Sequence, residues 1–286
     1  MDLLLGLDLG TTNCKVLAMD PSGRIVASVT APTPDRHNAN ELHSAEYDAD
    51  DLWRLFAQLL RSLHVKIAQA ALRPSSAPLP SAPSASALPR IAGLCVSSMG
   101  ESGVLLDAAG QACAPVIVWH DLRTKPYLQY WQARLSPTQL YQRTGLSIDH
   151  IYSASKLIWH REHTPAAFAR ATQWLGLADW LTFKLTGVPS VSLSMASRTM
   201  LFDPSTRTWS DDMLALAGIP SHLMPPLVTS GAVVGHVTAE AARQTLLPQG
   251  IPVSAGGHDH ICGAIAVGAI TPGISVGSSP SASMVK

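Results

Sequence analysis

The sequence predicts a soluble α/β domain. Of its 286 residues, 47% are hydrophobic and 14% are charged, which is ample material for a buried core and suits one or two domains. Short apolar runs bounded by turn residues indicate strands, and a longer segment with apolar residues at helical spacing lies between them. Strands and helices that succeed one another in this way are typical of the α/β class.

The charge and hydropathy patterns exclude several classes of protein. Twenty Lys and Arg balance twenty Asp and Glu, which argues against a nucleic-acid binder and against general disorder. The most apolar stretches, such as Ile261–Ile270, are shorter than the ~20 residues that cross a bilayer, and the N-terminus lacks the basic region of a signal peptide. We therefore expect a cytoplasmic protein with no membrane partner.

The cysteines are far apart and form no CxxC pair, so they predict reduced, mostly buried thiols and no zinc site. They are Cys14, Cys95, Cys113 and Cys262.

The first 72 residues predict three strands and a helix. The strands are expected at residues 3–7, 14–19 and 25–29, with a turn at Pro21–Gly23. Apolar residues at 52, 55, 56, 59, 60, 63 and 67 follow helical periodicity, and Asp50 or Asp51 is placed to cap that helix. Residues 74–89 contain only Pro, Ser, Ala and Leu, and this composition predicts a flexible insertion within the domain.

Strands and helices continue beyond the insertion. We expect strands at 91–97, 104–106, 116–118, 233–237 and 251–254, and helices over most of 126–185. A small-residue helix is expected at about 260–268, and residues 273–279 resemble a strand that enters a further Gly/Ser turn.

The first candidate functional motif is the segment from Asp8 to Lys15, of sequence DLGTTNCK. An acidic residue that ends a buried strand, followed by a Gly-Thr-Thr turn, can direct backbone N–H groups and hydroxyls at an anion. The acid could hold a hydrated Mg²⁺ against the same phosphate. The alternative is an ordinary hairpin with polar turn residues.

The second motif is Gly256–His260, of sequence GGHDH. Asp259 lies at a strand-to-helix junction, where it could cap the helix or act as a general base toward a substrate hydroxyl; the two roles are compatible. A metal site at His258 and His260 is not expected, because a third ligand with zinc-site spacing is missing.

The third feature is a pair of polar loops, at residues 98–103 and 119–123. Glu101, Asp121 and Arg123 can hydrogen-bond a polyol, and Trp119 offers an apolar face to a sugar. Solvated loops with a structural Asp–Arg pair are an equally weighted alternative.

Five segments in this order together resemble the FGGY carbohydrate kinases, members of the actin-like, ribonuclease H-fold ATPase superfamily. The segments are Asp8–Lys15, Val118–Thr124, Ser155–Trp159, Leu181–Gly187 and Gly256–Asp259. The resemblance covers nearly the whole chain. It implies a ribonuclease H-like α/β fold with a mixed β-sheet flanked by helices, and an ATP-dependent kinase that acts on a small sugar or polyol.

The resemblance also implies roles for individual residues. Asp259 would be the catalytic base, and Asp8 with Asp259 would hold Mg²⁺. Phosphate contacts would come from Gly10, Thr11, Thr12, Asn13, Lys15, Gly277, Ser278 and Ser279. The sugar pocket would be lined by Met99, Glu101, Trp119, Asp121 and His260.

Two departures from the family pattern affect these expectations. Xylulokinase-type members tend to carry Met-His in the first sugar loop, whereas Met99 is followed here by Gly100; glycerol kinases carry Arg-Glu, and only Glu101 is present. We favour a ketopentose such as xylulose, with glycerol or another polyol as the alternative.

Family members are also about twice as long. We expect residues 1–272 to form the sugar-binding domain and 273–286 to begin a truncated second domain, so a non-catalytic sugar-binding fragment is the rival interpretation. A homodimer is left open.

Overall fold

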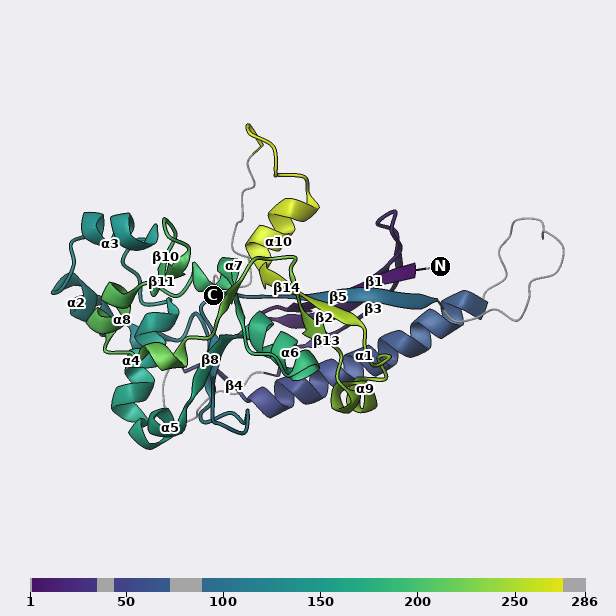
Figure 1. The fold of residues 1–286 in the computed structure, drawn as a ribbon, viewed down its shortest axis with the longest axis horizontal. Coiled ribbons are helices and arrows are strands. Elements are labelled where there is room, and N and C mark those ends of the chain that lie inside the picture. The colour runs from purple at the N-terminus through teal and green to yellow at the C-terminus, as the bar shows by residue number, and fades with distance from the viewer. Residues whose placement is uncertain (1, 35–43, 73–88, 275–286) are drawn as a thin grey trace.

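The computed structural model describes residues 2–34, 44–72 and 89–274. Its centre is a six-stranded mixed sheet with the strand order β13-β14-β5-β1-β2-β3 (Figure 1). In chain order the strands of this sheet are β1 (Asp2–Leu9), β2 (Asn13–Met19), β3 (Ile25–Pro32), β5 (Arg90–Ser98), β13 (Val233–His236) and β14 (Pro252–His258).

Three neighbouring strands of the sheet run parallel, and this places their carboxyl ends together. β5 is parallel to β1 on one side and to β14 on the other, whereas β2, β3 and β13 join antiparallel. Leu3, Leu5, Leu7 and Leu9 are buried on one face of β1, as expected from the alternation of side chains along a strand. The predicted mixed sheet is confirmed.

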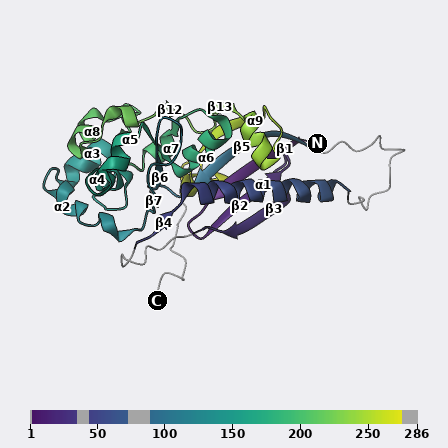
Figure 2. The same cartoon turned by 90° about the horizontal axis from the view of Figure 1, so that it is seen from below.

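Helices cover the two faces of the sheet unequally. The long helix α1 (Ala49–Leu72), α6 (Leu177–Thr186) and α9 (Ala239–Thr245) lie on one side, and α10 (Asp259–Ala266) rises from the other (Figures 1 and 2). The expectation that Asp50 or Asp51 caps α1 was wrong. Asp48 precedes the helix, and its Oδ1 accepts a hydrogen bond of 3.0 Å from the Asp51 N–H.

A helical lobe with its own apolar core lies beside the sheet (Figure 1). It contains α2 (Tyr127–Gln132), α3 (Pro137–Thr144), α4 (Ser153–His163), α5 (Pro165–Arg170) and α8 (Asp211–Ala217). Short strand pairs lie outside the six-stranded sheet: β4 (Glu46–Tyr47) with β7 (Val116–Ile117), β6 (Gly103–Leu106) with β8 (Gln173–Gly176), β9 (Val191–Ser192) with β12 (Leu227–Val228), and β10 (Phe202–Asp203) with β11 (Thr208–Trp209). The remaining helices are η1 (Leu122–Thr124), α7 (Leu193–Ala196) and η2 (Ser221–Leu223).

Several local expectations need correction. The helical region 126–185 is interrupted by β8, and β14 continues past its predicted end at Ser254 to His258. All four cysteines are free thiols, but only Cys14 is buried. The insertion at 74–89, apart from Pro89, lies outside the described residues, as does the predicted strand at 273–279 beyond Ile274. Within the described part of the chain, no helix is long and apolar enough to cross a membrane.

Candidate active site

Two carboxylates meet at the carboxyl ends of the parallel strands. Asp8 of β1 pairs with Ser97 of β5, and His258 at the end of β14 pairs with Ser98 of the same strand. Asp259 follows directly as the first residue of α10. The sheet therefore brings together the two acidic residues that the sequence singled out, although 250 positions of the chain separate them.

Asp8 is partly buried and held in place. The Ser97 hydroxyl donates a hydrogen bond of 2.7 Å to its Oδ1. Burial raises the pKa of Asp8 above its usual value, and the charge of Asp259 raises it further, while the Ser97 hydrogen bond and the charge of Lys15 oppose the rise. Asp259 and Lys15 are thus close enough to Asp8 to shift its pKa. Lys15 lies opposite Asp8 on the neighbouring strand β2.

The Gly-Thr-Thr turn between β1 and β2 is tight, and it needs a glycine. The Gly10 N–H donates to the Asn13 carbonyl at 3.1 Å, and a Cβ on Gly10 would lie 2.7 Å from that same oxygen. Thr33, directly after β3, donates from its hydroxyl to the Gly10 carbonyl at 2.7 Å and from its N–H to the Thr12 carbonyl at 3.0 Å. These contacts fix the turn while leaving Thr12, Asn13 and Lys15 exposed.

Thr11 connects this turn to the predicted sugar loops. Its hydroxyl accepts a hydrogen bond of 2.9 Å from Trp119 Nε1 and lies 3.7 Å from Met99 Sδ. The Tyr47 hydroxyl donates to the Thr11 carbonyl at 3.3 Å. Trp119 is half-buried and Met99 is buried, so both lie against the turn. The structure therefore places one edge of the expected sugar pocket beside the expected phosphate site.

Glu101 is buried and restrained by an arginine from a distant loop. Arg198 donates from Nε to Glu101 Oε1 at 2.7 Å, and the Ser153 hydroxyl donates to the Glu101 carbonyl at 3.0 Å. Glu101 has a φ of 64°, a left-handed conformation that is strained for a side chain of this kind. The contacts to Arg198 and Ser153 hold it there.

Asp121 does not face the site as a free sugar ligand. Its side chain is fully buried, and it accepts hydrogen bonds from the Ala45 N–H at 2.7 Å and from the N–H and Nε of Arg123 at 2.8 and 2.9 Å. Arg123 in turn pairs with Glu46 at 2.6 Å. Of the two interpretations of this loop, the structure favours the structural Asp–Arg pair, so we reassign Asp121 from sugar contact to loop anchor.

The Asp259 carboxylate lies between two imidazoles. His258 Nε2 is 3.5 Å and His260 Nε2 is 4.0 Å from Asp259 Oδ1, and the His260 N–H donates to the same oxygen at 2.7 Å. The Asp259 side chain is 33% exposed and that of His260 66%. Burial lowers the pKa of His258. The helix cap is His258, so the expectation that Asp259 caps α10 was wrong; Asp259 is the first helical residue.

Several residues that hold the site residues in place were not predicted from the sequence. Ser97, Thr33 and Arg198 each contact a predicted site residue, and Ser194 accepts a hydrogen bond of 2.9 Å from the His258 N–H. Ser97 could have been suspected because it ends a strand beside Asp8. Ser194 lies within the short helix α7 and Arg198 lies just after it, and neither position carries such a signal. The predicted phosphate residues Gly277, Ser278 and Ser279 lie outside the described residues.

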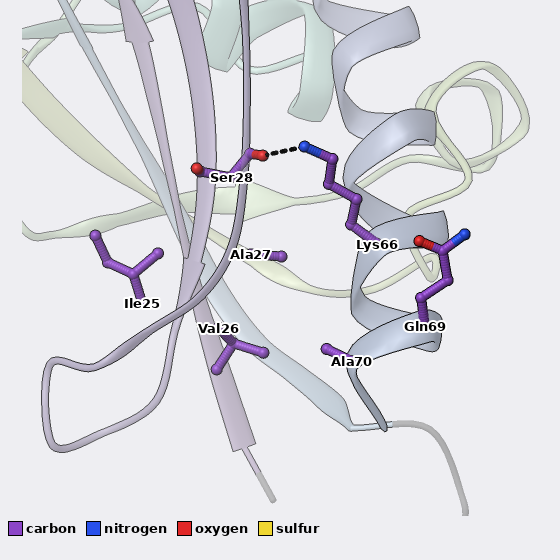
Figure 3. A pocket seen from close by; sticks show the side chains of 7 residues that line it. All are labelled: Ile25, Val26, Ala27, Ser28, Lys66, Gln69 and Ala70. Carbon is purple, nitrogen blue, oxygen red and sulfur yellow. Dashed lines mark hydrogen bonds between the residues drawn. The ribbon is translucent and has the colours of Figure 1, made fainter. Parts of the chain in front are cut away.

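A hollow between β3 and α1 offers no competing site (Figure 3). It is lined by Ile25, Val26, Ala27, Ser28, Lys66, Gln69 and Ala70. Lys66 donates from Nζ to the Ser28 carbonyl at 2.9 Å, and the lining contains no carboxylate to work with it. The hollow lies at the Ile25 end of β3, whereas Thr33 and the Gly-Thr-Thr turn lie at the opposite end.

Comparison with known proteins shows which family the chain belongs to. Residues 3–266 match the model of the N-terminal domain of the FGGY family of carbohydrate kinases. The chain belongs to the FGGY family. Its FGGY relatives include an L-fuculokinase of Salmonella typhi, which is 29% identical over 90% of this chain and 51% of that protein. A glycerol kinase of Bordetella parapertussis is 31% identical over 96% of this chain and 50% of that protein.

Solved structures agree with the assignment. The crystal structure of xylulose kinase from Rhodospirillum rubrum matches with a TM-score of 0.84 and 30% identity, over 95% of this chain and 52% of that one. The predicted actin-like fold is confirmed, and the curated relatives are named as kinases. This FGGY chain spans about half the length of the relatives it matches.

Proposed function

We propose that the chain carries the sugar-binding and catalytic half of an ATP-dependent carbohydrate kinase. The observation that carries the proposal is the convergence of Asp8 and Asp259 beside the Gly10 turn, at the carboxyl ends of parallel strands. In open α/β sheets this edge is where ligands bind. Phosphoryl transfer needs chiefly positioning and charge neutralisation there.

Asp259 is the proposed general base. One of its carboxylate oxygens would accept the proton of the sugar hydroxyl as that oxygen attacks the γ-phosphorus of ATP. The bond from phosphorus to the oxygen bridging the β- and γ-phosphates breaks, and ADP leaves with the electron pair. The His260 N–H, at 2.7 Å from Asp259 Oδ1, holds the carboxylate at the start of α10. Its one-third exposure leaves it accessible to a substrate.

Asp8 and Asp259 are the proposed ligands of Mg²⁺. Mg²⁺ is a hard dication that prefers oxygen ligands and negative charge, and two neighbouring carboxylates supply both. The charge of Asp259 contributes to the raised pKa of Asp8, so a dication between the two groups would relieve their repulsion. When bound, Mg²⁺ would neutralise charge on the phosphates. The exposed groups of Thr12, Asn13 and Lys15 would contact phosphate oxygens, together with turn N–H groups other than that of Gly10, which donates to the Asn13 carbonyl.

The proposed acceptor is a small sugar or polyol, with a ketopentose such as xylulose favoured. Met99, Glu101, Trp119 and His260 would line its pocket, and Asp121 would act indirectly by holding the loop. Support for a sugar comes from the relatives, which are named as fuculokinase, xylulose kinase, apulose kinase and glycerol kinase. The alternative acceptor is glycerol or another polyol. A cytoplasmic location and a possible homodimer remain part of the proposal.

A second candidate function is sugar binding without catalysis. The chain spans about half the length of its relatives, and the adenosine contacts are proposed to belong to the other half. Gly277, Ser278 and Ser279 are proposed to begin that second domain and to contact phosphate. A chain without those contacts would bind a sugar but would lack a closed cleft that excludes water from ATP.

The test is a coupled ADP-release assay with xylulose, fuculose, apulose and glycerol. It should be run on this chain and on a version extended by a second domain, with calorimetric titration of the same acceptors into this chain. Catalysis by the extended version with sugar binding alone by this chain supports both parts of the proposal. Absence of acceptor-dependent ADP release from the extended version would contradict the kinase function.

A further inference from the structure

The Asp259 carboxylate and its two neighbouring histidines bring three ligand atoms to one place. One ring nitrogen of His258, one of His260 and a carboxylate oxygen of Asp259 all lie within 4.8 Å of one another. Ligand atoms around a single transition metal, each at about 2.1 Å from it, are separated by roughly 3 to 4 Å. Small side-chain movements would therefore let all three atoms contact one ion. The sequence spacing argued against a metal site here, whereas the fold brings the ligand atoms of Asp259 and both histidines together.

The first of these ligands, His258, is fixed by close packing. A Cβ at Gly100 would lie 2.5 Å from His258 Cδ2 and 2.9 Å from Nε2, so the imidazole occupies the space that a side chain at position 100 would need. The backbone N–H of His258 is anchored to the Ser194 hydroxyl at 2.9 Å. The imidazole is thus held with Nε2 directed toward Asp259, at 3.5 Å from Oδ1.

The other side of the cluster is open. The His260 side chain is 66% exposed, and its ring lies edge-on to that of His258 with centroids 4.9 Å apart. The nearby cation Arg198 is paired with Glu101 at 2.7 Å, which reduces its repulsion of a bound dication. An ion could enter from solvent and keep positions for water or for a phosphate oxygen.

We propose that His258, Asp259 and His260 form a site for a transition-metal dication such as Zn²⁺ or Co²⁺. Imidazole nitrogen suits Zn²⁺ and Co²⁺ and is a poor ligand for Mg²⁺, which prefers oxygen. Two histidines and a carboxylate with an open position are a donor set of catalytic zinc sites. The site shares Asp259 with the proposed kinase chemistry, and an ion there would occupy the carboxylate needed as the base. The inference does not rest on the kinase function.

The test is titration of Zn²⁺, and separately Mg²⁺, into tag-free protein by calorimetry, without ATP or sugar. We expect one Zn²⁺ per chain, and a visible absorption spectrum on Co²⁺ binding that shows nitrogen ligation. His258→Ala and His260→Ala should each weaken Zn²⁺ binding at least tenfold, whereas His222→Ala, at an exposed histidine outside the cluster, should leave it unchanged.

Two further variants distinguish this site from one built on the neighbouring thiol. Gly100→Ala should weaken Zn²⁺ binding without removing a ligand, because it displaces the His258 ring. Cys262→Ser should have no effect, since the thiol is not in the proposed donor set. Zn²⁺ affinity that is unchanged in His260→Ala, lost in Cys262→Ser, or absent from the wild-type protein would overturn the proposal. None of these results bears on ADP release, so the kinase proposal is tested separately.

Discussion

Asp179 offers a quantitative test of how the scaffold supports the site. This α6 residue is 5% exposed, and its Oδ1 accepts a hydrogen bond of 2.9 Å from the Ser192 N–H. Ser192 is the N-cap of α7, whose Ser194 hydroxyl anchors His258. Oδ2 of Asp179 has no hydrogen-bond partner among the described residues. Burial raises the pKa of Asp179 from 3.8 to about 8.

The effect of Asp179 on the free energy of unfolding follows, in sign and size, from proton linkage. Between pH 4 and pH 8 the folded protein retains a proton on Asp179 that the unfolded chain has released, so stability falls as the pH rises. One pKa unit corresponds to about 1.4 kcal/mol, and the cost at pH 7 is therefore on the order of 4 kcal/mol. Asp179→Asn keeps the acceptor for Ser192 and cannot ionise, so it should remove most of this cost.

The assay is urea unfolding of wild type and Asp179→Asn at several pH values from 4 to 8. We expect the variant's advantage to be small at pH 4 and to grow to several kcal/mol at pH 8. Asp50→Asn, at an exposed position in the first turn of α1, is the control and should show no such growth. A stability difference that does not change with pH would refute the inference that Asp179 is protonated in the folded protein.

The remaining predictions concern the glycine contacts and the Asp8 environment. Gly256→Ala should cost about 3 kcal/mol or more in unfolding free energy, because its Cβ would lie 1.8 Å from the Val96 carbonyl oxygen. Gly263→Ala, inside α10 with open space around the new Cβ, should instead stabilise the protein by about 0.5–1 kcal/mol. Urea unfolding measures both changes, and equal changes in unfolding free energy for the two variants would contradict both predictions. Ser97→Ala should raise the pKa of Asp8 in an NMR titration, and an unchanged or lower value would refute the role of that hydrogen bond.

The sequence was most informative where the signal is local. The strand at residues 3–7 and the amphipathic helix from residue 52 follow simple periodicities, and both were found close to their observed bounds. Asp8 was recognised because it ends an apolar run, and Asp259 because it lies at a predicted strand-to-helix junction. The parallel pairing of β1 and β14 with β5 then brings them together. That convergence depends on the sheet order, which no local pattern contains.

The failures also have physical causes. Gly256 suggested that a strand ends, yet β14 continues because a residue without Cβ can approach the Val96 carbonyl closely. Asp121 could have been a sugar ligand or a structural partner, and only its burial against Arg123 decides between them. Arg198 reaches Glu101 across 97 positions of sequence, and it follows α7, which packs against β14 of the sheet.

The most direct test of the central claim is acceptor-dependent ADP release by Asp259→Asn and wild-type protein, each extended by a second domain. Asparagine keeps the shape of the side chain and can take no proton. We predict that one sugar or polyol stimulates ADP release by the wild type and that the variant loses it by about 10²-fold or more while remaining folded. Stimulation that survives in Asp259→Asn would show that Asp259 is not the base.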